Sequence, residues 1–288
     1  MGNVSDKYQD LLRGLRRLAL ADGGLTVAYS GGVDSAFLLA AAAQAFETLS
    51  DAPPLCALTA ISPSYPEWER APARALAREL GALHVEVETD ELDRPEYRAN
   101  QGDRCYHCKS ALFDVAALQR KVETHDDQKI HGALIYGAIV DDLGDHRPGM
   151  QAAQDHGVKA PLIEAGLTKS EVRALSHELG LPTWDKPASA CLASRFPYGT
   201  EVTAERLNQV GRCEARLMAL GLAVVRARYH GDVVRLELGE RELNQVLEDS
   251  QLRREITSSC KEVGFRFVSL DLEGYRSGSA NEALVVIQ

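Results

Sequence analysis

The sequence predicts an α/β protein, with a parallel sheet between helices followed by a smaller α/β domain. Two observations predict it. Over the first two thirds of the 288 residues, short apolar runs alternate with segments of helical periodicity, the pattern of a parallel sheet. From about residue 200, a helical segment precedes two alternating runs that meet at a tight turn. We therefore expect one domain over residues 1–199 and another over residues 200–288.

The first elements follow from periodicity. Residues 6–20 have the apolar spacing of a helix, residues 24–30 form a β-rich run, and residues 33–46 return to helical composition. The same order then repeats, with a buried strand, a helix that ends at a glycine, and an alternating strand expected at residues 54–62, 67–81 and 83–89.

The pattern continues through the middle of the chain. We expect a helix at about residues 109–120, a polar surface loop at 121–129 and a buried strand at 133–140. Thr168 and Glu171 have the spacing of a capping box, and Gly180 supplies a stop, so a helix is predicted between them.

The smaller domain shows four further elements. A helix is expected at residues 203–221, a final strand at 265–272, and two strands within 223–238 that join at residues 230–232. The domain boundary is expected inside "ASRFPYGTEVT", residues 193–203.

Composition narrows the function. Thirty-two basic and 42 acidic residues give a net charge of −10, which disfavours a general nucleic-acid binder and an acidic-membrane binder. No apolar run approaches the roughly 18 residues that a membrane span needs. We expect a cytoplasmic protein with neither a membrane nor a nucleic acid as partner. In that reducing compartment, its six cysteines are expected to be core residues, metal ligands or catalytic thiols.

The strongest chemical signal is "YSGGVDSAFLL", residues 29–39. Gly31 and Gly32 allow the backbone to approach a ligand, while Ser30, Ser35 and the amides that open the next helix can donate to a polyphosphate. No Walker lysine is present in the turn. Asp34 is expected to organise Mg²⁺ and phosphate. A purely structural Ser/Gly turn, with Asp34 as an ordinary helix-start carboxylate, is the alternative.

The SGG-x-D-S signature resembles the pyrophosphate loop of the ATP pyrophosphatases, whose adenine-nucleotide alpha-hydrolase-like fold the resemblance implies here. Members of that superfamily activate a carbonyl or carboxyl oxygen by adenylation. ATP and Mg²⁺ are therefore the expected cofactors of this loop.

Three further stretches narrow the resemblance. "YGAIVDDLGDHRPG" at residues 136–149 follows a predicted strand with Asp141, Asp142, Asp145 and Arg147, where open sheets collect ligand groups. "PLIEAGLTKSEVR" and "WDKPASACLASRFPYGTEVT" follow at residues 161–173 and 184–203. Together with the loop, these stretches resemble the LarE family, the sulfur transferases that help make the nickel-pincer nucleotide cofactor of lactate racemase.

The resemblance implies a specific reaction. ATP adenylates a carboxylate of pyridinium-3,5-biscarboxylate mononucleotide, pyrophosphate leaves, and sulfur then displaces AMP to give a thiocarboxylate. A carboxylate is a poor electrophile, whereas its mixed anhydride with AMP carries a good leaving group. The expected partners are the nucleotide substrate, a source of sulfide and further copies of the chain in a homo-oligomer, for which the family suggests a hexamer.

The second domain offers a site for the phosphate of such a substrate. Arg226, Arg228 and His230 share one face of a predicted strand. A solvated hairpin face is the alternative. The resemblance implies a phosphate site that also includes residues of the preceding segment and a glutamate nearby; its members are Ser194, Arg195, Arg226 and Arg228, with Glu214. Arg235 and Glu237 alternate on the next strand.

The cysteines raise the question of the sulfur source. Cys105 and Cys108 have C-x-x-C spacing, and Cys191 follows in "PASACLAS". Some members of the family give up the sulfur of a single cysteine, but that position falls nearer Ala190 in our alignment. The chain is more similar to a second branch, in which Cys105, Cys108 and Cys191 would hold a [4Fe–4S] cluster with one iron open for sulfide.

Other interpretations of these thiols stay open. They are a zinc site with His107, a thioredoxin-like pair, incidental cysteines, or a sacrificial or persulfidic Cys191. The remaining Cys56, Cys213 and Cys260 are expected in the core.

Rival functions are a tRNA thiolase, an ammonia-using amide synthetase and a non-enzymatic nucleotide-binding module. The acidic charge disfavours the first, and the three thiols disfavour the second. The arginine-bearing second domain disfavours the third.

Overall fold

The computed structural model describes residues 3–121, 130–144, 147–187 and 191–276. They divide into two compact units. The first takes the described residues within 3–62, 69–91 and 105–187, and the second takes those within 63–68, 92–104 and 191–276.

The first unit is built on a parallel sheet of four strands in the order β3-β2-β1-β4. The strands are β1 (Leu25–Ala28), β2 (Leu55–Ile61), β3 (Leu83–Glu88) and β4 (Ala133–Tyr136). Leu25 pairs with Leu55 on one side and with Ala133 on the other. The predicted parallel α/β sheet is confirmed. Because β2 and β4 lie on opposite sides of β1, the strand order reverses beside β1, where open sheets bind ligands.

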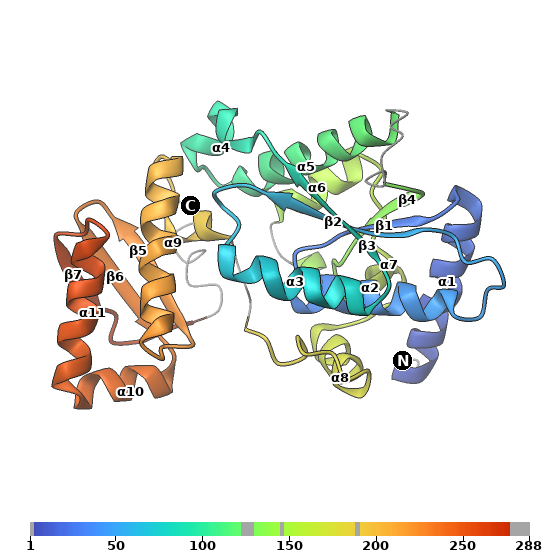
Figure 1. Ribbon diagram of the computed structural model, residues 1–288. Coiled ribbons are helices and arrows are strands. Elements are labelled where there is room, and N and C mark those ends of the chain that lie inside the picture. The colour runs from blue at the N-terminus through green and yellow to red at the C-terminus, as the bar shows by residue number, and fades with distance from the viewer. Residues whose placement is uncertain (1–2, 122–129, 145–146, 188–190, 277–288) are drawn as a thin grey trace. The chain divides into compact units, whose positions relative to one another are not determined.

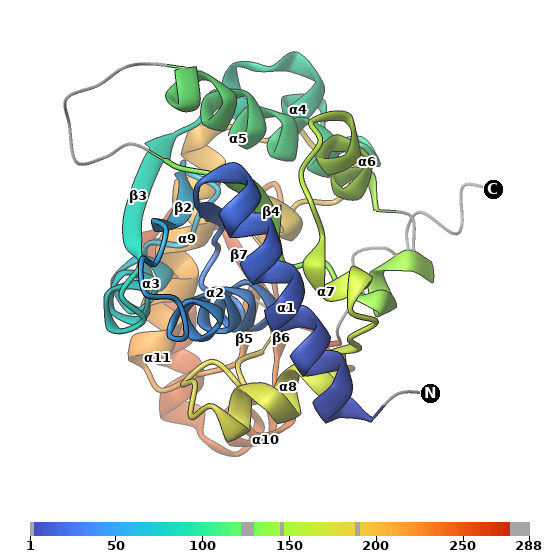
Figure 2. The same ribbon diagram turned by 90° about the vertical axis from the view of Figure 1, so that its right-hand side faces the viewer.

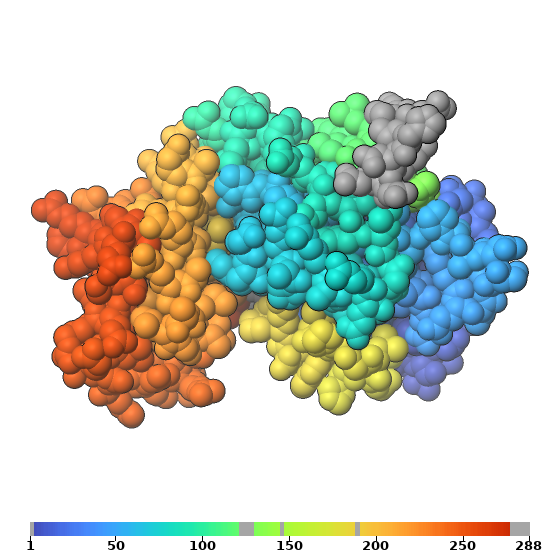
Figure 3. Space-filling model, in the orientation of Figure 1, coloured from blue at the N-terminus to red at the C-terminus, as the bar shows by residue number. Residues whose placement is uncertain are grey.

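Helices cover both faces of this sheet (Figures 1 and 2). One hydrophobic cluster joins one face to α1 (Val4–Asp22), α2 (Val33–Phe46), α3 (Glu67–Glu79), α7 (Pro161–Glu164) and α8 (Lys169–Glu178). A second cluster joins the other face to α5 (Arg104–Lys121) and α6 (Pro148–Asp155). Helix α3 buries only its sheet-facing side, so its outer side forms part of the surface in Figure 3.

Local signals set the helix ends as expected. The Thr168 side chain accepts from the Glu171 amide and the Glu171 side chain accepts from the Thr168 amide, so the predicted capping box of α8 is present. Gly180 then adopts a left-handed φ of 69°, which a glycine tolerates at a helix end. None of the described helices is long and apolar enough to cross a membrane.

The helix after the C-x-x-C begins earlier than the predicted residue 109. Helix α5 starts at Arg104, so Cys105 and Cys108 lie in its first two turns rather than in a loop before it. Its sequence there contains neither Gly nor Pro, and the Arg104 amide donates to the Gln101 carbonyl in the turn that leads in. The predicted loop at 121–129 falls almost entirely outside the described residues.

The second unit has a three-stranded sheet in the order β5-β6-β7. β5 (Val225–His230) and β6 (Val233–Leu238) form the predicted hairpin, and β7 (Phe267–Leu270) runs parallel to β6. Helix α9 (Ala204–Ala219) packs on β5, and α11 (Ser250–Glu262) packs on α9 and β7. The second unit also contains α10 (Glu240–Glu248), α4 (Pro95–Ala99) and the short 3₁₀ segment η3 (Leu192–Arg195). Of the other short 3₁₀ segments, η2 (Val140–Gly144) belongs to the first unit, and η1 (Glu91–Asp93) begins in the first unit and ends in the second.

Candidate active site

The glycine turn between β1 and α2 forms the proposed pyrophosphate loop. Gly31 has a left-handed φ of 72°, and Gly32 is the N-cap of α2. Ser35 Oγ accepts from the Ser30 amide and donates to the Gly32 carbonyl, each at 3.2 Å, while the Ser30 hydroxyl lies 3.2 Å from it. The hydrogen bonds of the two serines therefore stabilise the conformation of the loop, and their hydroxyls can also contact a ligand.

Backbone amides at the start of α2 are available to an anion. The Ala36 amide is the one that donates to the Gly32 carbonyl, at 2.9 Å. The amides of Val33, Asp34 and Ser35 precede the first carbonyl that an α-helix could offer them. With the positive end of the helix dipole, they make the N-terminus of α2 a site suited to phosphate oxygens.

The segment after β4 closes on this helix start. A Cβ atom on Gly137 would lie 2.9 Å from the Asp34 carbonyl carbon and from the Ser35 nitrogen, closer than real Cβ contacts. Glycine is thus required here because two backbones approach each other. The contact brings the acidic stretch after β4 to the pyrophosphate loop, as its position after a strand led us to expect.

A lysine from outside the motif reaches Asp34. Lys169, the first residue of α8, places Nζ 2.7 Å from both carboxylate oxygens of Asp34. Its own amide donates to Asp141 Oδ2 at 2.9 Å. Asp142 accepts from the Ile139 amide at 3.0 Å and pairs with Arg147 at 2.8 Å. Asp145 lies outside the described residues.

A second lysine contacts the loop itself. Lys186 Nζ donates to the Gly31 carbonyl at 2.9 Å and forms an ion pair with Glu69 of α3. Sequence reasoning found no lysine in the motif, and it missed these two because both come from far along the chain. The quoted stretches "LTKSE" and "WDKP" contain them, but their spacing gave no sign of contact with the loop.

In the second unit, Arg195 and Glu214 form a buried ion pair. Nε and Nη2 of the guanidinium lie 2.8 Å from the two carboxylate oxygens, and the side chains are 2% and 1% exposed. Burial is the largest single influence on the pKa of Arg195 and lowers it, but the charge of Glu214 and the hydrogen bonds that it accepts from Arg195, with smaller contributions from Cys191 and Tyr275, together raise the pKa. Glu214 also accepts from the Ala227 amide at 2.8 Å, and Arg195 donates to Ser194 Oγ at 2.9 Å.

The arginines of β5 adjoin this pair. Arg228 donates to the Ser194 carbonyl at 2.8 Å and pairs with buried Glu237 at 2.7 Å. Burial, and then the neighbouring charge of Arg195, lowers the pKa of Arg226, whose guanidinium lies 4.9 Å from the Tyr275 ring centre. The structure thus brings together Ser194, Arg195, Glu214, Arg226 and Arg228. Sequence reasoning missed the contact with Tyr275.

Comparison with known proteins decides the family. The chain is 35% identical over 293 residues to the pyridinium-3,5-bisthiocarboxylic acid mononucleotide synthase of Lactiplantibacillus plantarum, covering 100% of this chain and 98% of that protein. The chain belongs to the LarE family. An uncharacterized protein of Synechocystis is 43% identical over 263 residues, covering 90% of this chain and 92% of that one.

Family models and solved structures do not narrow the family further. No family model matches the chain. The NMN synthetase of Francisella tularensis superposes with a TM-score of 0.44 at 16% identity, covering 92% of this chain and 96% of that one.

The six cysteines of this LarE-family chain fall into two classes of three. Cys105 is exposed, and Cys108 and Cys191 are partly exposed. Cys56, Cys213 and Cys260 are fully buried, which confirms their expected place in the core. Cys105 and Cys108 belong to the first unit and Cys191 to the second.

Their accessibility suits thiolates that meet a metal group, and an i, i+3 spacing puts Cys105 and Cys108 on one face of α5. Within the part of the chain that the structure describes, no cluster of three or more His, Cys, Asp or Glu side chains is assembled for a metal ion.

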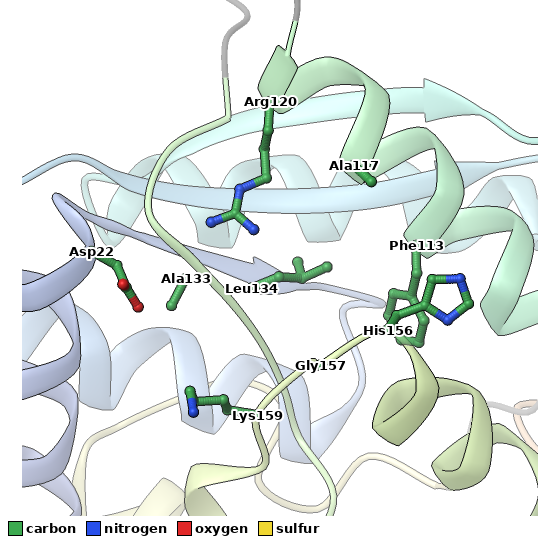
Figure 4. Close-up of a pocket in the computed structure, with 9 residues that line it drawn as sticks. All are labelled: Asp22, Phe113, Ala117, Arg120, Ala133, Leu134, His156, Gly157 and Lys159. Atoms are coloured by element: carbon green, nitrogen blue, oxygen red, sulfur yellow. The ribbon is translucent and has the colours of Figure 1, made fainter.

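A pocket of about 280 Å³ lies away from the LarE motifs, beside the start of β4 (Figure 4). Arg120, Lys159 and His156 line it together with Asp22 and apolar groups. Leu25 and Ala133, at the starts of β1 and β4, pair at this edge, whereas the pyrophosphate loop follows the end of β1. We therefore place the candidate active site at the loop and not in this pocket.

Proposed function

We propose that this protein is an ATP-dependent sulfur transferase that converts carboxylates of pyridinium-3,5-biscarboxylate mononucleotide into thiocarboxylates. The observation that carries the proposal is the 35% identity along the whole chain to a synthase named for the bisthiocarboxylic acid product. The braced pyrophosphate loop supports it, because adenylation needs a site for the phosphates of ATP.

The first step is adenylation at the loop. A carboxylate oxygen of the substrate attacks the α-phosphorus of ATP, the bond between the α-phosphorus and its bridging oxygen breaks, and pyrophosphate leaves. Ser30, Ser35 and the amides of Gly31 and Gly32 are the proposed phosphate ligands. Mg²⁺ bound with ATP would neutralise phosphate charge, with Asp34 as its proposed organiser.

The second step is sulfur transfer. A sulfur nucleophile attacks the carbonyl carbon of the acyl adenylate, the bond to the phosphate oxygen breaks, and AMP leaves. Repetition on the second carboxylate gives the bisthiocarboxylate. Cys191 is the proposed catalytic cysteine, as a ligand of the sulfide-carrying group proposed below or, in the alternative, as the sulfur carrier itself.

The substrate phosphate is proposed to bind Ser194, Arg195, Arg226 and Arg228. Glu214 holds Arg195 in a fixed orientation, so the guanidinium is preorganised. Burial, and after it the charges of Arg195 and Arg228, lower the pKa of Arg226. A dianionic phosphate would relieve this like-charge repulsion. On this proposal, residues 1–199 serve mainly ATP and residues 200–288 mainly the substrate and the subunit contacts of a homo-oligomer.

For the sulfur source we propose a [4Fe–4S] cluster held by Cys105, Cys108 and Cys191. Three accessible thiols and the one-turn spacing of the first two fit such a ligand set. When bound, the cluster would supply an iron position open to sulfide. A sacrificial or persulfidic Cys191 is the alternative source. The cysteine usage also leads us to propose a cytoplasmic location.

The test is anaerobic purification of wild type and Cys191→Ser, with iron and sulfide analysis. Each protein is then incubated with the pyridinium dicarboxylate nucleotide, ATP, Mg²⁺ and sulfide. We expect iron in wild type and much less in Cys191→Ser. Both proteins should release pyrophosphate, because adenylation precedes sulfur transfer, whereas wild type alone should form a thiocarboxylate with release of AMP.

Each negative result would exclude a different part of the proposal. Iron-free wild type that forms dehydroalanine at Cys191 after one turnover would assign the sulfur to the cysteine itself. No pyrophosphate release with this nucleotide would overturn the substrate assignment. Gel filtration with light scattering tests the proposed homo-oligomer, and a monomer at micromolar concentration would contradict it.

A further inference from the structure

Lys186 contacts the least constrained peptide of the pyrophosphate loop. The peptide between Gly31 and Gly32 has a glycine on each side, so its plane can rotate at low steric cost. Its carbonyl oxygen accepts from Lys186 Nζ at 2.9 Å. Because C=O and N–H point in opposite directions in a trans peptide, fixing the Gly31 carbonyl also fixes the direction of the Gly32 N–H.

The ammonium is held by a carboxylate that is itself fixed. Glu69 lies in the first turn of α3, where a negative charge is favourable, and its side chain is 10% exposed. Burial first, and the charge of Glu69 second, raise the pKa of Tyr29, which immediately precedes the loop. Glu69 therefore adjoins the loop from the α3 side and pairs with Lys186 there.

The main chain around Lys186 is anchored on the same helix that supplies Lys169. Arg173 of α8 donates to the Trp184 carbonyl at 2.7 Å and to the Lys186 carbonyl at 2.8 Å. The Lys186 amide donates to the Thr183 carbonyl in a turn. Helix α8 therefore positions Lys169 at Asp34 directly and positions Lys186 at Gly31 through Arg173.

We propose that Lys186 is a positioning residue of the ATP site: it locks the Gly31–Gly32 peptide in the orientation that leaves the Gly32 amide for a phosphate oxygen. The present acceptor of that amide is Ser30 Oγ at 3.4 Å, a long contact that a charged oxygen can replace. The inference deepens the proposed function and rests on ATP binding at this loop.

The lock also adds a positive charge that the motif lacks. An ammonium has three N–H bonds, of which the Gly31 carbonyl and Glu69 take two among the described residues. Because Lys186 orients the Gly31–Gly32 peptide before ATP arrives, less conformational entropy is lost when ATP binds.

The experiment compares Lys186→Met and Lys186→Arg with wild type. The matched control is Lys7→Met, since Lys7 has a similar exposure, 22% against 23%, and a carboxylate partner, Glu171, at 2.7 Å. Binding of α,β-methylene ATP with Mg²⁺ is measured by calorimetry, which needs no carboxylate substrate. Hydrogen exchange over residues 29–36 is measured without nucleotide, and melting midpoints are recorded for all four proteins.

We expect Lys186→Met to bind the analogue at least about tenfold more weakly, the effect of losing a charge-assisted hydrogen bond. Its loop should exchange faster, and Lys186→Arg should recover part of both effects. In turnover, the KM for ATP should rise more than kcat falls. Lys7→Met should lower the melting midpoint without changing binding of the analogue.

Unchanged loop exchange in Lys186→Met would overturn the lock. So would wild-type affinity for the analogue, or equal losses in Lys186→Met and Lys7→Met. If wild type itself fails to bind the analogue, the ATP part of the proposed function is wrong, and the exchange measurement still decides whether Lys186 orders the loop.

Discussion

Lys169 Nζ lies 2.7 Å from each carboxylate oxygen of Asp34, although 135 residues separate the two in the chain. The pair joins the start of α8 to the start of α2. The two contacts from the ammonium fix the orientation of the Asp34 carboxylate beside the proposed phosphate site. On the proposed function, Asp34 would share this contact with Mg²⁺ bound to ATP, and Lys169 would then be near the phosphates.

We expect Asp34→Asn to reduce pyrophosphate release at least about a hundredfold, as loss of one charge-stabilising group does in other active sites. The amide keeps the shape but removes the charge. The melting midpoint should stay close to that of wild type. Asp10→Asn is the control, because Asp10 pairs with Arg13 on the exposed side of α1. Wild-type release by Asp34→Asn would contradict a role for this carboxylate.

Gly137 gives a test of the backbone contact beside the loop. We expect Gly137→Ala to lower the free energy of unfolding by about 1–3 kcal/mol, because the new methyl group would meet backbone atoms of Asp34 and Ser35 at 2.9 Å. A Cβ at Gly144 meets nothing within 4 Å, so Gly144→Ala should change it by less than about 0.5 kcal/mol. Urea denaturation measures both. Equal effects of the two substitutions would show that the close approach does not constrain the chain.

Much of this architecture could be predicted from the sequence. The alternation of strands and helices, the capping box at Thr168 and the hairpin turn at Gly231 are local signals, and each is present. The serines and glycines of the loop were also recognised, because the motif is contiguous.

What the sequence could not show are contacts between distant residues. Lys169, Lys186 and Glu69 meet the loop only because the fold returns α8 and α3 to it. The start of α5 is predicted at residue 109, after the C-x-x-C, whereas the helix begins at Arg104, because nothing in the composition of residues 104–108 interrupts it.

The buried pair of Arg195 and Glu214 predicts a large effect on stability. We expect Arg195→Met to cost about 3–5 kcal/mol of the free energy of unfolding, because it leaves Glu214 charged and buried. Arg216→Met removes an exposed partner of Glu262 and should cost about 0–1 kcal/mol. Both are measured by chemical denaturation at neutral pH. Similar losses in the two variants would mean that the carboxylate of Glu214 finds another partner.

Glu86 predicts a pH dependence. Hydrogen bonds from Arg70 lower its pKa most. Burial raises the pKa, but hydrogen bonds from Arg74 lower it again, and the resulting pKa is about 2. A lowered pKa in the folded state contributes stability that is present above the usual value of 4.5 and is lost as the pH falls toward 2. We expect Glu86→Gln to be less stable than wild type at pH 7, with the difference shrinking steadily below about pH 4.5. A difference that stays constant from pH 7 to pH 3 would contradict the ion pairs.

Thiol labelling tests which cysteines are available as ligands. In metal-free native protein we expect Cys105, Cys108 and Cys191 to react with iodoacetamide, since all three are at least partly exposed. Cys56, Cys213 and Cys260 should react only after unfolding, because they are fully buried. Mass spectrometry of proteolytic peptides identifies the labelled positions.

The same labelling after anaerobic reconstitution with iron and sulfide addresses the cluster. Coordinated thiolates cannot attack the reagent, so a bound cluster should protect all three accessible cysteines together. Protection of Cys105 and Cys108 with Cys191 still reactive would exclude the three-cysteine cluster and leave Cys191 as an independent sulfur carrier. Labelling of Cys213 or Cys260 in the native protein would instead show that the second unit opens, and the accessibility argument for the other three would lose its basis.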